Sequence, residues 1–112
     1  MNIEKIKEEL LGNIFNGLFE LDNRVKAVLG STYSLFDATT DCVRNAGCAY
    51  PVKNEDAEEG WIEINVDWKI LNEKEEDITD AFIKAYNDEE ESWKRSEIME
   101  KCIAKIVDVW EL

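Results

Sequence analysis

Carboxylates are the chemically functional side chains that dominate this 112-residue chain, and most of them fall in one segment. Residues 54–91, called here the acidic segment, hold 15 Asp and Glu against three Lys, a balance of −12 out of a formal net charge of −13. Carboxylates at this density could work as an acid–base pair, hold a divalent cation, or attract a basic partner. The regional concentration favours a basic partner, because a bias serving solubility alone would be spread evenly along the chain.

Sixteen residues of the acidic segment are the candidate partner-binding residues. Trp61 is the only one that is not an acid, and a tryptophan among carboxylates suits an interface anchor, with coverage by a helix as the alternative. A row of carboxylates spaced on the order of one charge per 2 Å would approach the charge density of a duplex backbone and could occupy a groove lined by Lys and Arg. The set comprises Glu55, Asp56, Glu58, Glu59, Trp61, Glu63, Asp67, Glu73, Glu75, Glu76, Asp77, Asp80, Asp88, Glu89, Glu90 and Glu91.

Motifs for catalysis and cofactor binding are missing from the sequence. There is no phosphate-binding glycine loop, nucleophile elbow, zinc-protease pair or CxxC motif, and the chain contains no histidine. We therefore expect no catalytic residue, no metal site and no cofactor. An enzyme that uses a carboxylate pair with a divalent metal is an alternative.

The three cysteines, Cys42, Cys48 and Cys102, are an odd number in a chain whose first residues lack the layout of a secretory signal. We expect reduced, packed thiols rather than a disulfide framework, and a location in the cytoplasm of a host or producing cell. No apolar run reaches 18 residues, so no membrane partner is expected.

The clearest structural pattern follows an exposed loop at 54–60. Apolar residues alternate with polar ones from Ile62 to Ile70, which is the period of a half-buried strand. Such a strand needs a partner, and the options are residues 48–53 before the loop, a hairpin within residues 24–37, or the same strand of another subunit.

The N-terminal part shows a helical stripe from Leu11 to Val28, with Asn2 as a plausible N-cap and Gly30 as a plausible C-cap. We expect a helix through at least Phe19. The competing interpretation uses Gly12 and Gly17 as breaks, with a hairpin turn after residue 29. A short helix is expected from Thr39 to Ala46, ending at Gly47.

The C-terminal part returns to helical spacing. Ile78, Phe82 and Tyr86 predict one helix, with several acids in or near its first turn. A last helix starting at Ser92 or Ser96 would bury apolar residues from 98 to 109. The sequence thus predicts an α+β fold in a single domain, residues 1–112, with N- and C-terminal helices around a small antiparallel sheet.

The preferred functional hypothesis is a small acidic inhibitor that mimics nucleic acid and blocks a basic nucleic-acid-binding protein or nuclease. In size, acidity and lack of enzyme motifs the chain is similar to phage anti-CRISPR and anti-restriction proteins and to the immunity proteins of nuclease toxins, although no motif assigns it to a family. Direct binding to nucleic acid is disfavoured by charge repulsion. The alternative is an oligomeric interaction module, such as a homodimer, formed through the N-terminal apolar stripe.

Overall fold

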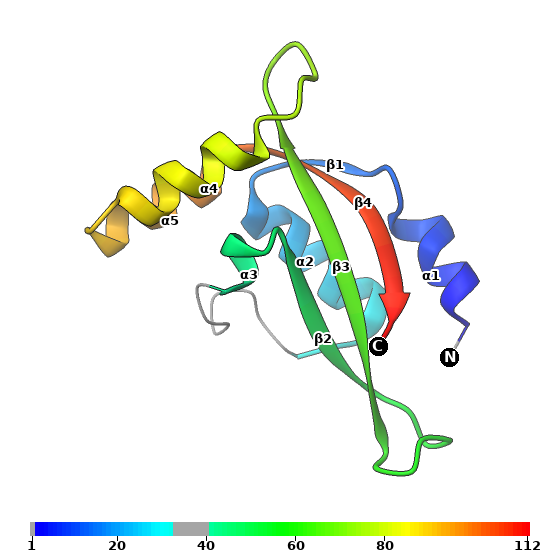
Figure 1. Cartoon of the computed structure of the whole chain (residues 1–112). Coiled ribbons are helices and arrows are strands. Elements are labelled where there is room, and N and C mark those ends of the chain that lie inside the picture. The colour runs from blue at the N-terminus through cyan, green and yellow to red at the C-terminus, as the bar shows by residue number, and fades with distance from the viewer. Residues whose placement is uncertain (1, 33–40) are drawn as a thin grey trace.

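A four-stranded antiparallel sheet with the strand order β1-β4-β3-β2 organises the chain (Figure 1). In the computed structural model, which describes residues 2–32 and 41–112, helices and strands both occur, and the predicted α+β class is confirmed. No helix in these two ranges is long and apolar enough to cross a membrane. The elements are α1 (Ile3–Leu10), β1 (Ile14–Asn16), α2 (Leu18–Leu29), α3 (Asp41–Arg44), β2 (Gly47–Lys53), β3 (Trp61–Leu71), α4 (Thr79–Asp88), α5 (Ser92–Glu100) and β4 (Ile103–Glu111).

Strand β3 is the long central strand that the alternating pattern predicts. Its inward residues Ile64, Val66, Trp68 and Ile70 are buried, and the residues between them lie on the open face. Its first partner is β2, which precedes it in the sequence, so of the three partners considered it is residues 48–53 that pair with it, across the loop at 54–60. Its second partner is β4, at the C-terminus.

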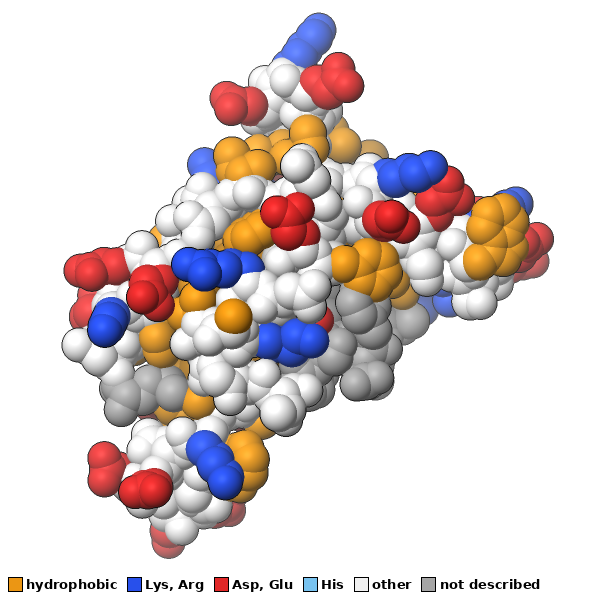
Figure 2. All heavy atoms as spheres, turned by 180° about the vertical axis from the view of Figure 1, so that it is seen from behind, with side chains coloured by type: hydrophobic (Ala, Val, Ile, Leu, Met, Phe, Trp, Pro, Cys, Tyr) orange, Lys and Arg blue, Asp and Glu red, His pale blue; other side chains and the backbone are white. Residues whose placement is uncertain are grey.

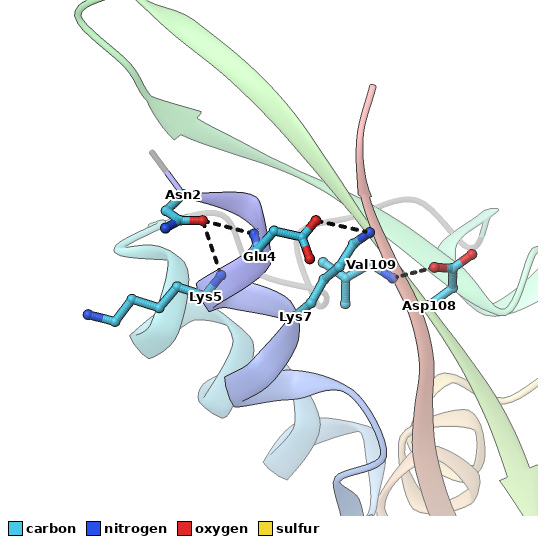
Figure 3. A network of polar contacts seen from close by, with 6 residues as sticks. All are labelled: Asn2, Glu4, Lys5, Lys7, Asp108 and Val109. Carbon is cyan, nitrogen blue, oxygen red and sulfur yellow. Dashed lines mark hydrogen bonds and ion pairs between the residues drawn. The ribbon is translucent and has the colours of Figure 1, made fainter.

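Helices α1 and α2 supply the other half of the core. The side chain of Asn2 accepts hydrogen bonds from the backbone N–H groups of Glu4 and Lys5, which confirms it as the N-cap of α1 (Figure 3). Gly30 ends α2 in the left-handed conformation, which confirms the predicted C-cap. Leu18, Leu21 and Val25 of α2 are completely buried, so the portion of the N-terminal apolar stripe on α2 is part of the core, whereas Leu11 and Ile14 before it are exposed.

A buried polar contact ties α2 to the sheet. The hydroxyl of Tyr50 in β2 donates a hydrogen bond of 2.8 Å to Asp22 Oδ1, and neither residue is exposed to solvent. Lys26 Nζ lies 3.5 Å from Asp22 Oδ2. A carboxylate at such depth requires these partners, because an unsatisfied buried charge is strongly destabilising.

Replacing Tyr50 by phenylalanine should therefore lower the free energy of unfolding by about 1.5–3 kcal/mol, since it removes one hydrogen bond from a buried carboxylate while preserving the ring. Urea unfolding followed by tryptophan fluorescence measures the change. Tyr86→Phe on α4 is the control, because it also removes the hydroxyl of a buried tyrosine but leaves Asp22 intact. Equal losses for the two variants would contradict the importance of the Asp22 contact.

The predicted continuous N-terminal helix is wrong. Residues 11–17 leave the helical path, and Ile14–Asn16 pair with β4 as a short edge strand. Gly12 and Gly17 have positive φ angles of 79° and 106°, which interrupt a helix and which side-chain-bearing residues rarely adopt. The breaks of the competing interpretation are therefore present, but its hairpin turn after residue 29 is not, because α2 extends to Leu29.

The predicted C-terminal helix is wrong beyond Glu100. A helix does start at Ser92, but residues 103–111 form strand β4, so the chain ends in the sheet. A bulge explains the misleading pattern. Asp67 pairs with Asp108 whereas Trp68 pairs with Ile106, which leaves Val107 as an extra residue. The buried residues Ala104, Ile106 and Val109 are thereby spaced by two and then three, and this spacing imitates a helix.

Residues around α3 also depart from expectation. Cys42 and Cys48 form a disulfide, so the prediction of reduced thiols is wrong for this pair, while Cys102 is free. The short helix spans Asp41–Arg44, and the predicted positions 39–40 lie outside the described residues. Ala46, with a φ of 49°, takes the left-handed position predicted for Gly47, which is already part of β2.

Candidate functional site

The structure places most of the predicted acids at three extremities of the molecule. The first set occupies the β2–β3 hairpin loop, the second the turn between β3 and α4, and the third the tip of the arm formed by α4 and α5 (Figure 1). Seen from behind, acidic side chains lie on all three projections (Figure 2). The hairpin set is Glu55, Asp56, Glu58 and Glu59; the turn set is Glu73, Glu75, Glu76, Asp77 and Asp80; the arm-tip set is Asp88, Glu89, Glu90 and Glu91.

The hairpin loop holds its acids outward through its own hydrogen bonds. Asn54 N–H donates to the carbonyl of Gly60 at 2.9 Å, and the Asn54 side chain accepts from Asp56 N–H at 3.0 Å. All four acids of the hairpin set are exposed. Trp61, the next residue, is 53% exposed, so coverage by a helix is wrong, and its indole is accessible to a partner.

The turn set surrounds Asn72, whose side chain orders the loop. Its Oδ1 accepts hydrogen bonds from Lys74 N–H at 2.9 Å and Glu76 N–H at 3.0 Å, and its amide nitrogen donates to Glu76 Oε1. Glu75 sits between them with a φ of 63°. This turn precedes α4, so of the acids predicted in or near the first turn of the helix, Asp80 lies within it and the others come before it.

Asp77 is the acid of the turn set with a structural task. Its Oδ1 accepts hydrogen bonds from both the backbone N–H and the hydroxyl of Thr79, at 2.9 and 2.5 Å. These bonds, followed by the charge of Lys69 at 3.6 Å, lower the pKa of the Asp77 carboxyl. Asp77 therefore anchors the start of α4 in addition to contributing charge.

Two predicted acids, Glu63 and Asp67, lie on the open face of β3 between the hairpin loop and the turn. Glu63 is exposed, whereas Asp67 is half-buried and accepts a hydrogen bond of 2.6 Å from the Asn65 amide. Burial raises the pKa of Asp67, the Asn65 bond opposes that shift, and the facing Asp108 adds to it. Because Asp67 faces Asp108 on β4, the middle of β3 also carries negative charge.

The arm tip combines acids with a second exposed tryptophan. Trp93 is 60% exposed, its indole N–H donates to Glu91, and Lys94 lies over its ring. Arg95 donates to the backbone carbonyl of Glu89 and so fixes the connection between α4 and α5. Trp93 was not among the predicted site residues. Its position two residues after the acidic run repeats the relation of Trp61 to Glu59, and this repetition is the signal that could have identified it.

The three sets are not brought together on one patch. Strand β3 has eleven residues, which at about 3.3 Å each separate the hairpin loop from the turn by roughly 33 Å. Helix α4 has ten residues and separates the turn from the arm tip by roughly 15 Å. The acids therefore follow a bent line along β3 and then along the arm, and this line of acids, formed by the three sets with Glu63 and Asp67, is called here the acidic path.

No family model, no characterised protein and no solved structure matches this chain. The acidic path and its two exposed tryptophans are consequently the observations from which a function is inferred. They are properties of the surface.

The free thiol of Cys102 lies between α5 and β4. Burial raises its pKa to about 11. At pH 8 the native thiol should therefore react with iodoacetamide roughly 100-fold more slowly than in urea, where its pKa returns to an ordinary value, because the thiolate is the nucleophile. Mass spectrometry of labelled protein over time measures both rates. A native rate equal to the unfolded rate would contradict the burial of this thiol.

Proposed function

We propose that this chain is a small acidic inhibitor that binds a basic nucleic-acid-handling protein in the groove where that protein takes DNA or RNA. The observation that carries the proposal is the excess of −12 within residues 54–91, displayed at exposed positions along β3 and the arm. A groove built to neutralise phosphates offers the opposite charge over a comparable length.

The acids of this path retain most of their charge for a partner. Two of the three lysines in the acidic segment pair within it, Lys69 with Asp77 and Lys84 with Asp88, and this pairing leaves the excess unchanged. Exposed carboxylates keep their hydration until the final contact, so they pay little desolvation free energy as they approach a cationic groove. Their summed electrostatic field increases the rate of association. An inhibitor of this type would associate rapidly and in a salt-dependent manner.

The two exposed tryptophans give this mimic a means of specific attachment. Trp61 and Trp93 each lie beside an acidic set, one at the hairpin and one at the arm tip. Tryptophans are frequent anchors in protein interfaces, where they fill pockets while neighbouring charges set the orientation. A nucleic-acid-binding groove often contains such pockets, because bases stack on its apolar and aromatic walls.

The alternative of a homodimer formed through the N-terminal apolar stripe has less support. Leu18, Leu21 and Val25 pack inside the core and have no exposed surface. They could not contact a second copy without separating α2 from the sheet. We therefore retain the inhibitor as the proposed function.

The test is a panel of purified nucleases: a CRISPR effector, a restriction endonuclease and a nuclease toxin, each assayed with and without the chain. We expect inhibition of at least one enzyme at about 50 mM salt, a marked loss of inhibition near 200 mM, and displacement by competing DNA that the enzyme does not cleave. A chain that inhibits none of the three classes at the lower salt concentration would reject the proposal in this form.

A further inference from the structure

A cavity of about 480 Å³ opens where the arm leaves the sheet, apart from the exposed tryptophans. Its apolar wall is formed by Ile70 and Leu71 at the end of β3, Ile78 and Phe82 of the arm, and Ile103 at the start of β4. Ile78 is 37% exposed, so part of this wall is accessible to solvent. Pockets of 300–1,000 Å³ with largely apolar walls are typical of small-molecule sites.

The cavity is preformed, because backbone contacts hold its walls. Ile78 N–H donates to the carbonyl of Ile70 at 2.8 Å, and Leu71 forms a bridge with Asp77. On the opposite side, the end of α5 lies tightly against the β1–α2 junction, where a Cβ at Gly17 would come within 2.5 Å of the Glu100 carbonyl. A ligand would therefore not have to order these walls when it binds.

The polar groups of the cavity are biased toward negative charge. Glu73 and Glu100 both contribute to its lining, together with the amides of Asn16 and Asn72. Lys101 also lines the cavity, but its ammonium group forms an ion pair with Glu97. The Cys102 thiol in the same lining donates a hydrogen bond to the carbonyl of Met99 at 3.3 Å. The lining therefore combines an apolar wall with two acidic residues.

We propose that this cavity binds a small organic cation, in which a ring or branched hydrocarbon contacts the Ile78 wall and a protonated amine lies between Glu73 and Glu100. The hydrocarbon loses contact with water, and the ammonium group keeps charged hydrogen-bond partners. This site is independent of the inhibitor proposal, since it requires neither tryptophan and only one acid of the path.

The test compares three probes of similar size: 2-phenylethylammonium, 2-phenylethanol and 3-phenylpropanoate. Titration followed by NMR should give saturable shifts for the cation with a Kd on the order of 1 mM, at least tenfold weaker binding of the alcohol, and no saturation with the anion. Bound cation should also slow the alkylation of Cys102, which lines the cavity and serves as an internal reporter.

Two double variants with the same change of net charge distinguish an effect of the cavity acids from an effect of the overall negative charge of the protein. Glu73→Gln with Glu100→Gln should weaken cation binding by tenfold or more and leave the weak binding of the alcohol unchanged. Glu58→Gln with Glu90→Gln, on the hairpin and the arm tip, should leave the cation affinity within twofold. Equal weakening by both pairs would overturn the proposal, as would the absence of saturable cation binding to the native protein.

Discussion

Replacing Gly17 by alanine should lower the free energy of unfolding by about 3 kcal/mol or more, which is a large fraction of the stability of a small domain. Two separate costs contribute. Gly17 has φ 106° and ψ 157°, a backbone conformation that is adopted almost only by glycine. In any other residue this conformation destabilises the fold by about 1–3 kcal/mol. The added Cβ would also lie 2.5 Å from the backbone carbonyl of Glu100, so α5 would have to move, at a further cost of about 1–3 kcal/mol.

Gly12→Ala is the matched control for this prediction. Gly12 also has a positive φ, 79°, but a Cβ there would meet no atom within 4 Å. We expect it to cost about 1–2 kcal/mol from backbone strain alone. Urea unfolding of both variants, with far-UV circular dichroism as the probe, measures the difference. If the two glycines proved equally replaceable, the close contact between the β1–α2 junction and α5 would be refuted.

Reversing three charges of the acidic path should reduce the association rate with the inhibited nuclease by about 100-fold at low salt, because steering by an opposite field contributes between tenfold and a thousandfold. The variant combines Glu58→Lys, Glu59→Lys and Glu90→Lys, all at exposed positions of the hairpin and arm tip. Glu76 and Asp77 are avoided because they hydrogen-bond within the turn, so their loss would change structure as well as charge. Stopped-flow association at two salt concentrations provides the measurement.

The control for this charge reversal carries the same net charge. Glu8→Lys, Glu9→Lys and Glu111→Lys change three exposed acids outside the acidic segment. This variant should keep an association rate within a few-fold of the native protein at physiological salt, where fields decay over about 8 Å. Equal losses for the two triple variants would mean that net charge, and not the acidic path, determines binding.

Local patterns predicted the parts of the fold whose structure is determined locally. The alternation from Ile62 to Ile70 predicted β3, and the polar run before it predicted an exposed loop, because a strand buried on one face and a solvated loop each affect residue type directly. The caps Asn2 and Gly30 were also predicted correctly, since capping depends on single residues.

Tertiary pairing decided the parts that were predicted wrongly. Ile14–Asn16 is a strand only because β4 offers it hydrogen bonds, and three residues are too few to show a period. The Cys42–Cys48 disulfide depends on α3 folding back beside β2. The number of cysteines in the sequence does not show which of them lie close together. For the candidate site, the acids could be identified from composition, but their separation by β3 and the exposure of Trp93 required the structure.

The bulge at Val107 divides β4 into two halves whose alternation is out of phase by one residue. An insertion or deletion elsewhere in a strand turns every following inward side chain toward solvent. At the bulge the opposite holds: without Val107, Ile106 and Val109 would alternate regularly and both would still face the core. The strand can thus change its length by one residue at this point while its buried set stays the same, which makes the bulge the natural place for related chains to differ in length.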